Sequence, residues 1–239
     1  MADAYVNWKG WKEVNFGHYT SEEALYYAAE LRKSGIDSLL GLRIGEIGFG
    51  NGSFAGWIRH EGGQWVGSEL ISLLQERALY AGFDVAGAHD SLANGLGHDA
   101  FDLIVAFDVL EHIDIAGIQK FLVDSKSALK PGGAIIFRVP SGDSPFSGAI
   151  FSGDLSHRTL LGSSAVWQIA EHAGLKVHQI RCPVLPFFGL GLFRAVRRWL
   201  THIVQKLVFS FIRYFLISNS RAVVSPNMIV VLLKKDPHS

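Results

Sequence analysis

A short apolar segment that runs into a glycine-rich turn and then into a helical pattern constrains the fold of this chain most. Leu42 to Ile47 has the composition of a buried strand, and the turn after it contains Gly48, Gly50 and Gly52. From Ser53 to His60 the apolar residues recur at helical spacing. Such a turn directs backbone N–H groups and the positive end of a helix toward a polar or anionic ligand, which glycine lets the backbone approach closely.

The alternation of strand and helix patterns continues along the chain. Strands are expected at residues 64–68, 83–88, 101–107 and 134–139, and helices at 21–33, 70–80, 115–129 and 165–173. The run from Phe101 to Phe107 is typical of a central parallel strand that is covered on both faces, and Asp102 within it is interpreted as a strand-start residue and not as a catalyst. Strands that alternate with helices of this length predict a parallel α/β sheet.

Composition limits the class of protein. The chain has 239 residues, of which 49% are hydrophobic, so it can bury one substantial core. Its single cysteine, Cys182, excludes a disulfide framework and a cysteine-rich zinc site and fits a reducing compartment. The first residues show no basic cluster followed by an apolar run, so no secretory signal is expected. We therefore expect a cytoplasmic protein, and the sequence assigns no metal site.

Charge is distributed unevenly between the two ends of the chain. Residues 1–171 carry 12 Lys and Arg against 21 Asp and Glu, whereas residues 172–239 carry 10 against 1. Within the basic part, Phe193 to Ile217 has the pattern of a long amphipathic helix, and His202, Lys206 and Arg213 interrupt its apolar content too often for a membrane span. A basic C-terminal third indicates contact with an anionic or membranous partner, or simply a second lobe that complements the first.

The glycine turn alone is compatible with several nucleotide cofactors, because nicotinamide and flavin proteins use related loops. Two details separate it from theirs. The spacing is G-x-G-x-G, not G-x-G-x-x-G, and Glu46 lies two residues before the first glycine. A carboxylate at that position repels a pyrophosphate but suits an ammonium group.

The landmarks along the chain resemble those of the class I S-adenosylmethionine-dependent methyltransferases. Ile44 to Gly52 is similar to the first motif of that family, Trp65 to Glu69 to its second strand, and Phe101 to Ile113 to the fourth strand and following turn of its small-molecule branch. Leu129 to Gly133 resembles the turn before strand five. The resemblance covers residues 40–180, and more loosely Met228 to Lys235 as the last, antiparallel strand.

The resemblance implies a Rossmann-like, doubly wound, seven-stranded sheet, mostly parallel with the last strand antiparallel, and S-adenosylmethionine as cofactor. We expect an N-terminal helical lid (1–40), a cofactor-binding core (41–183), a basic amphipathic helical insertion (184–225) and a last strand with tail (226–239). Glu69 would bind the two ribose hydroxyls and Asp90 the adenine amine. The full predicted set of cofactor-binding residues is Glu46, Gly48, Gly50, Asn51, Gly52, Glu69, Leu70, Asp90, Ser91, Phe107 and Asp108.

Two histidines are candidates for a general base. If the methyl acceptor is a hydroxyl, a neutral imidazole near pH 7 can take its proton. His112 follows the fourth strand, at the sheet edge where open α/β sheets bind ligands. His157 lies in Asp154-Leu155-Ser156-His157, where the family's acceptor-side loop carries a similar Asp-x-x-His. Either histidine can instead have a purely structural role, His112 in capping its turn and His157 in a loop salt bridge.

The acceptor is not identified by any motif. Phe16, Tyr19 and Tyr26 are expected to close over the cofactor, and residues 140–146 to line the acceptor side. The pattern resembles enzymes that methylate small metabolites or glycans, with O-methylation preferred. The basic helix at 193–217 can lie on the inner face of a membrane and reach a lipid-linked acceptor, or it can form a homodimer interface. Nucleic acid is not expected. The competing interpretations are a nicotinamide-dependent oxidoreductase and a catalytically silent, membrane-attached scaffold.

Overall fold

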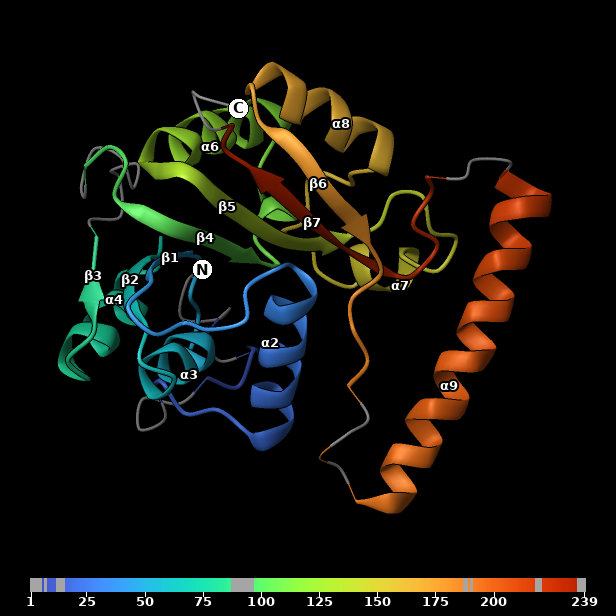
Figure 1. Ribbon diagram of the computed structural model, residues 1–239, viewed down its shortest axis with the longest axis horizontal. Coiled ribbons are helices and arrows are strands. Elements are labelled where there is room, and N and C mark those ends of the chain that lie inside the picture. Colours follow the sequence, from blue (N-terminus) through green and yellow to red (C-terminus); the bar gives the residue numbers. More distant parts are fainter. Residues whose placement is uncertain are drawn as a thin grey trace.

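A computed structural model describes residues 6, 8–11, 16–86, 97–186, 189, 191–217 and 221–235 of the chain. Within these residues the fold is built around one seven-stranded sheet with the strand order β3-β2-β1-β4-β5-β7-β6 (Figure 1). The strands are β1 (Arg43–Ile47), β2 (Gln64–Ser68), β3 (Asp84–Val85), β4 (Phe101–Phe107), β5 (Leu129–Pro140), β6 (Lys176–Arg181) and β7 (Asn227–Leu233). Only β7 runs antiparallel to its neighbours, β5 and β6. The predicted Rossmann-like sheet is therefore confirmed.

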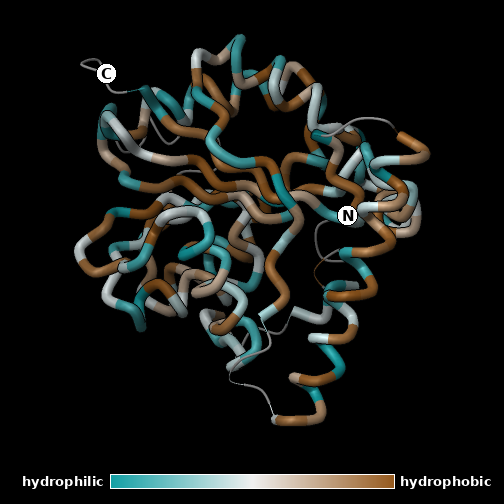
Figure 2. The backbone as a smooth tube through the Cα atoms, turned by 45° about the vertical axis from the view of Figure 1, so that its right-hand side comes forward, coloured by the Kyte–Doolittle hydropathy of each residue, from teal (hydrophilic) through white to brown (hydrophobic). Residues whose placement is uncertain are grey.

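Helices cover both faces of the sheet (Figure 1). One face carries α6 (Ile115–Ala128) and α8 (Ser163–His172), and the other carries α2 (Ser21–Lys33), α3 (Ser53–His60) and α4 (Ser72–Tyr80). Each face has its own hydrophobic cluster, with Leu122 and Val166 in one and Leu31 and Ile58 in the other. The apolar strands lie between the two helical layers in Figure 2. This double covering explains why Phe101–Phe107 is almost entirely apolar.

Most predicted elements agree with the structure to within a few residues. Thr20 is the N-cap of α2, and it forms a reciprocal capping box with Glu23. Leu129 to Gly133, expected as the turn before the fifth strand, already belongs to β5, because α6 ends at Ala128. The third strand is shorter than expected, and residues 87–96, which follow it, lie outside the described part.

Asp102 has the structural role that the sequence suggested. Its carboxylate accepts a hydrogen bond from the backbone N–H of Arg43 (2.8 Å) and contacts the Nζ of Lys130 (2.8 Å). These contacts hold the pKa of Asp102 below its ordinary value in spite of some burial. They tie together the starts of β1, β4 and β5, at the edge of the sheet opposite the glycine turn.

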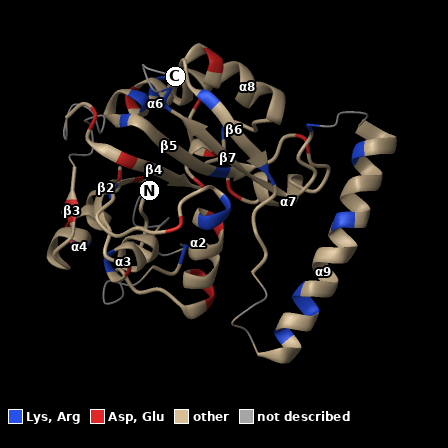
Figure 3. Cartoon of the chain, viewed as in Figure 1, with Lys and Arg blue, Asp and Glu red and all other residues tan. Residues whose placement is uncertain are grey.

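The long helix near the C-terminus extends along one side of the molecule (Figure 1). It comprises α9 (Leu192–Phe211) and a π-helical continuation, η3 (Ile212–Ile217). By length and composition alone this helix could cross a membrane, and only 6% of its most apolar stretch is buried. Lys and Arg occur along α9, as Figure 3 shows, and no Asp or Glu occurs in it. The structure thus confirms the predicted helix. Contrary to the expectation from the sequence, its length and composition do not exclude a membrane span.

Candidate active site

A cavity of about 1010 Å³ lies at the carboxyl edge of the parallel strands. Its walls come from the ends of β1, β2, β4 and β5, from α2, from residues 183–186 and from the start of α9. The predicted site residues that line it are Glu46, Gly48, Gly50, Asn51, Glu69, Leu70, Phe107, Asp108 and His112. Residues scattered from position 46 to position 112 therefore converge on one cavity, as the position of ligands in open α/β sheets predicts.

The glycine turn has a backbone conformation that residues other than glycine rarely adopt. Gly48 and Gly50 have φ angles of 68° and 55°. A Cβ at Gly48 would lie 2.5 Å from Cγ2 of Val109, and one at Gly50 would lie 2.9 Å from the ring of Trp11. Both the conformation and the space require glycine. Gly52, also at positive φ, is the N-cap of α3 and lies behind the turn against Phe16 and not on the cavity wall.

Glu46 is a buried carboxylic acid that faces the cavity. Its side chain is 5% exposed, and its Oε2 accepts a 2.7 Å hydrogen bond from Nε1 of Trp65. Burial raises the pKa of Glu46 to about 8, and the negative charge of Glu69 adds to the rise. Among the described residues no Lys or Arg forms an ion pair with it. A buried acid without a countercharge fits a cationic ligand, such as the ammonium of a methionine moiety.

Glu69, at the end of β2, connects that strand to the glycine turn. Its Oε2 accepts the N–H of Gly50 at 3.2 Å, and its Oε1 accepts the N–H groups of Leu70 (2.7 Å) and Ile71 (3.1 Å). The carboxylate is thereby fixed on the cavity wall, where it can accept hydrogen bonds from two neighbouring hydroxyls. Leu70 beside it is 77% exposed and lines the same wall, as expected of an apolar neighbour of the adenine ring.

Asp108 lines the cavity but is paired within the protein. Arg138 of β5 contacts both of its carboxylate oxygens and donates from Nη1 to the hydroxyl of Tyr26 (3.0 Å). The hydrogen bonds to Asp108 raise the pKa of Arg138 although burial opposes them, whereas burial raises the pKa of Tyr26. Arg138 and Tyr26 both line the cavity, and the sequence analysis did not assign Arg138 any role. The ring of Phe107 packs against Tyr27 and Phe54 in the adjoining wall.

His112 lies on the cavity wall within a polar chain. Its Nδ1 is 3.0 Å from Oγ of Ser156, and the Ser156 hydroxyl donates to Oδ1 of Asp154. Burial lowers the pKa of His112, and the neighbouring ring of His157 lowers it further. The imidazole of His112 is therefore neutral near pH 7, the form that a general base requires.

His157 does not line the cavity but packs directly behind His112. The two ring centroids are 4.7 Å apart, and Nδ1 of His157 is 2.8 Å from the carbonyl oxygen of Phe151. Its Nε2 lies 4.0 Å from Oε1 of Glu111, whose side chain is 2% exposed. Burial raises the pKa of Glu111 to about 8, and the charge of Asp108 contributes. Glu111 was not among the predicted site residues, although it precedes His112 directly.

The remaining predictions are only partly met. Asp90 and Ser91 lie outside the described residues. Of the three aromatic residues expected over the cofactor, Tyr26 lines the cavity, whereas Phe16 packs against Phe49 and Phe83 and Tyr19 against His60. Trp11 takes the place of these two on the cavity wall.

The segment expected on the acceptor side lies elsewhere. The hydroxyls of Ser141 and Ser144 donate to the carbonyls of Val223 and Val224, so residues 140–146 brace the segment that leads into β7 and contribute nothing to the cavity wall. The cavity wall includes Pro183, Val184, Leu185 and Pro186 instead.

Comparisons with known proteins identify the family and the fold of the chain. A family model described as methyltransferase domain matches residues 6–180. A SAM-dependent methyltransferase from Archaeoglobus fulgidus superimposes with a TM-score of 0.61 at 18% identity, covering 88% of this chain and 94% of that one. One from Mesorhizobium loti gives 0.57 at 17% identity, with coverages of 87% and 97%.

Phosphoethanolamine N-methyltransferase 2 from Haemonchus contortus, in complex with S-adenosyl-L-methionine, gives a TM-score of 0.55 at 19% identity, with coverages of 90% and 53%. No curated protein matches the sequence significantly. The family model spans most of the chain and the fold agrees with it. The chain therefore belongs to the methyltransferase-domain family, which confirms its recognition as a class I, S-adenosylmethionine-dependent methyltransferase.

Proposed function

We propose that this methyltransferase transfers a methyl group to a hydroxyl of a small-molecule, glycan or lipid-linked acceptor at a membrane surface. Bound S-adenosylmethionine supplies a methyl group that its sulfonium has already activated. Glu46 binds the ammonium of the methionine moiety, and Glu69 binds the ribose hydroxyls beside Leu70. The glycine turn, with Asn51, forms the floor of this part of the cavity. Asp90 and Ser91 remain our proposal for the adenine end.

The neutral imidazole of His112 supports O-methylation more than any other observation. The Ser156 hydroxyl donates a hydrogen bond to Asp154, so its oxygen accepts one from Nδ1–H of His112. The lone pair of the His112 ring is therefore on Nε2. A lone pair at the cavity wall can take the proton of an acceptor hydroxyl as the oxygen attacks the methyl carbon. Asp154 then stabilises the imidazolium through Ser156. His157 supports the ring of His112 and does not itself face the acceptor.

The acceptor end of the cavity is formed by α2, residues 183–186 and α9. Arg198 of α9 lines the cavity and pairs with Glu22 of α2 (2.7 Å), while its Nη1 donates to the carbonyl of Pro186 (2.8 Å). Arg194 pairs with the same glutamate. The start of α9 is thus fixed beside the cavity, so anything that binds α9 is brought to the acceptor end.

The outward face of α9 and η3 carries large apolar side chains. Those that are more than 40% exposed are Leu192, Phe193, Val196, Trp199, Leu200, Val204, Leu207, Phe211, Tyr214, Phe215 and Leu216. The inward stripe is mixed, with Arg198, Gln205 and Phe209 partly covered. Because the helix has no acidic residue and exposes Arg197 and Lys206, an anionic lipid surface is the partner that we propose for it. We therefore propose that the enzyme binds the inner face of a membrane.

Transfer of label tests the chemistry. The purified full chain is incubated with methyl-labelled S-adenosylmethionine and with separated lipid, glycan, protein and RNA fractions of cells. We expect label in the lipid or glycan fraction, as a methyl ether that survives mild base, and a loss of at least about tenfold in rate for His112→Gln. Label on nitrogen or carbon would contradict O-methylation, and retained cofactor binding without label anywhere would support a silent scaffold.

Sedimentation with liposomes tests the membrane contact separately. We expect the chain to bind vesicles that contain phosphatidylglycerol and to be released by high salt, because part of the attraction is electrostatic. Leu207→Glu on the outward face should weaken binding at least about tenfold. The matched control, Thr201→Glu, adds the same charge at an exposed polar position. A stable dimer that hides this face, or resistance of the bound chain to salt and alkaline extraction, would contradict peripheral binding.

A further inference from the structure

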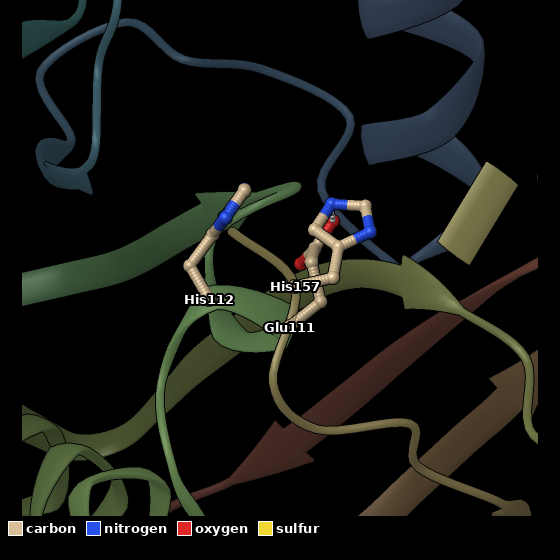
Figure 4. Close-up of side chains that lie close together, drawn as sticks. All are labelled: Glu111, His112 and His157. Atoms are coloured by element: carbon tan, nitrogen blue, oxygen red, sulfur yellow. Dashed lines mark ion pairs between the residues drawn. The ribbon is translucent and has the colours of Figure 1, made fainter. Parts of the chain in front are cut away.

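Three side chains at the cavity wall and directly behind it bring metal-ligating atoms together. Glu111 and His112 lie on η2 (Leu110–His112), directly after β4, and His157 comes from the loop before α8. One donor atom from each lies within 4.8 Å of the others. In Figure 4 the carboxylate of Glu111 lies beside the ring of His157, and the ring of His112 lies across from both. The cluster combines two imidazoles and one carboxylate.

Hydrogen bonding orients His157 for a ligand role. A carbonyl oxygen can only accept, so the contact of 2.8 Å between Phe151 O and Nδ1 of His157 assigns the proton to Nδ1. The lone pair of the ring is then on Nε2, which lies 4.0 Å from Oε1 of Glu111. Because Nε2 of His157 and Oε1 of Glu111 are both acceptors and both buried, a positive charge between them would be stabilising.

His112 is oriented in the same way by Ser156 and Asp154, which put the proton on its Nδ1. Both histidines therefore have their outer nitrogen hydrogen-bonded to a partner, the arrangement that metal-ligating histidines in proteins almost always show. The outer partners come from one short segment, residues 151–156, that packs against η2.

Glu111 completes the set because its carboxyl group is buried and pairs with no Lys or Arg among the described residues. Its Oε2 is buried and accepts no hydrogen bond from any residue that the structure describes, and its side chain is 2% exposed. Its backbone carbonyl is held by the N–H groups of Arg158 and Thr159. The nearest cations are already engaged: Lys9 lies 3.7 Å from Asp154, and Arg138 pairs with Asp108. A buried carboxylate oxygen without a hydrogen-bond partner, next to two oriented imidazoles, offers the donor atoms that a metal cation binds.

We propose that Glu111, His112 and His157 bind a divalent transition-metal cation such as Zn²⁺, Fe²⁺ or Mn²⁺. Two nitrogen donors and one carboxylate suit these ions better than Mg²⁺ or Ca²⁺, which prefer oxygen. Bonds of about 2.0–2.2 Å require the three donors to draw closer than they are without the ion. Three protein ligands leave positions open for water or for an oxygen of the acceptor.

The cation site gives the acceptor a more specific chemistry, and this step alone rests on the proposed function. Because His112 also lines the cavity, a cation bound to it would lie beside the cavity, where an acceptor oxygen could take an open coordination position. The Nε2 lone pair of His112 then binds the cation and no longer acts as the base, and a hydroxyl on the cation becomes acidic enough to release its proton to water. An oxygen-rich acceptor, such as a diol or a sugar, would therefore react faster with the metal present than without it.

Metal binding by the full chain tests the site without any acceptor. After removal of metals with a chelator, the protein is titrated with Co²⁺, followed by visible absorption, and with Zn²⁺, followed by calorimetry. We expect one tightly bound ion per chain, and affinity at least about 100-fold lower in Glu111→Gln and in His157→Gln. His172→Gln, an exposed histidine on α8, is the matched control and should bind as the wild type does.

Affinity for S-adenosylhomocysteine shows whether each variant is folded, because neither Glu111 nor His157 lines the cofactor wall. Failure to bind a stoichiometric ion, or equal affinity in the wild type, Glu111→Gln and His157→Gln, would overturn the site. If the wild type binds the ion and the two variants do not, but the wild type transfers no methyl group, the metal site stands and the proposed function is contradicted.

Discussion

Nε1 of Trp65, on β2, donates a 2.7 Å hydrogen bond to Oε2 of Glu46, on the neighbouring strand β1. The indole orients the carboxyl group at the floor of the cavity but does not neutralise it. Burial therefore holds the pKa of Glu46 at about 8, and the acid is mostly protonated at pH 7. Binding of an ammonium group must ionise it, which couples binding to the release of a proton.

The first prediction follows from this coupling. Binding of S-adenosylhomocysteine at pH 7 should release close to one proton per site, and affinity should fall by about tenfold for each pH unit below 8. Calorimetry in buffers of different ionisation enthalpy measures the released proton. Glu46→Gln should bind more weakly and without this proton release. An affinity that does not change between pH 6 and pH 8 would show that the ammonium does not meet Glu46.

Glu46 should also lower the stability of the protein without ligand. Its pKa in the folded protein is above the ordinary value of 4.5, so the unfolded chain ionises first and stability falls as the pH rises from about 4.5 to about 8. Replacement by Gln should remove that loss and stabilise the free protein at pH 9 by on the order of a few kcal/mol. The melting temperatures of the two proteins should converge near pH 5 and diverge toward pH 9. A parallel pH dependence would contradict the assigned pKa.

Glu69 should contribute to cofactor binding through both the ribose and the glycine turn. Glu69→Ala removes an acceptor for the ribose hydroxyls and frees the N–H of Gly50. We expect affinity for S-adenosylhomocysteine to fall by about 10- to 100-fold, the effect of one lost charged hydrogen-bond pair. Glu76→Ala, at an exposed position on α4, serves as the control. Unchanged affinity in Glu69→Ala would refute the ribose assignment.

The pair between Asp108 and Arg138 should matter to stability through both charge and backbone. Asp108 has a φ of 56°, which Asn tolerates better than Ala. Asp108→Asn should cost about 1–2 kcal/mol, a modest value because the Asp108 side chain is 46% exposed. Asp108→Ala should cost more, since it adds backbone strain to the lost pair. Thermal unfolding gives this order, and equal losses would mean that the backbone is unstrained.

The cofactor side of the site could be predicted because it is local in sequence. Glu46, the glycines and Glu69 each lie at or just after the end of a strand that the hydrophobic pattern indicates, and the ends of parallel strands meet at one edge. Arg138 was missed, although a charged residue within the apolar strand Ala134–Val139 signals a buried partner. Strand patterns indicate which residues are apolar but not which ion pairs form across the sheet.

The acceptor side could not be predicted in the same way. The contact between His112 and Ser156 joins residues 44 positions apart through a loop without periodic pattern. The same holds for Pro183 to Pro186, which form the far wall of the cavity. In the C-terminal helix the amphipathic pattern was evident, but the sequence does not show that its apolar face points outward. The outward direction follows from the ion pairs of Arg194 and Arg198 with Glu22, which hold the basic side of the helix against the protein.

Calorimetric titration of the full chain with S-adenosylhomocysteine and with NADH distinguishes a methyltransferase from a nicotinamide-dependent oxidoreductase. We expect one S-adenosylhomocysteine per chain, weaker binding in both Glu46→Gln and Glu69→Ala, and no measurable binding of NADH. Tight binding of NADH without binding of S-adenosylhomocysteine would contradict this expectation.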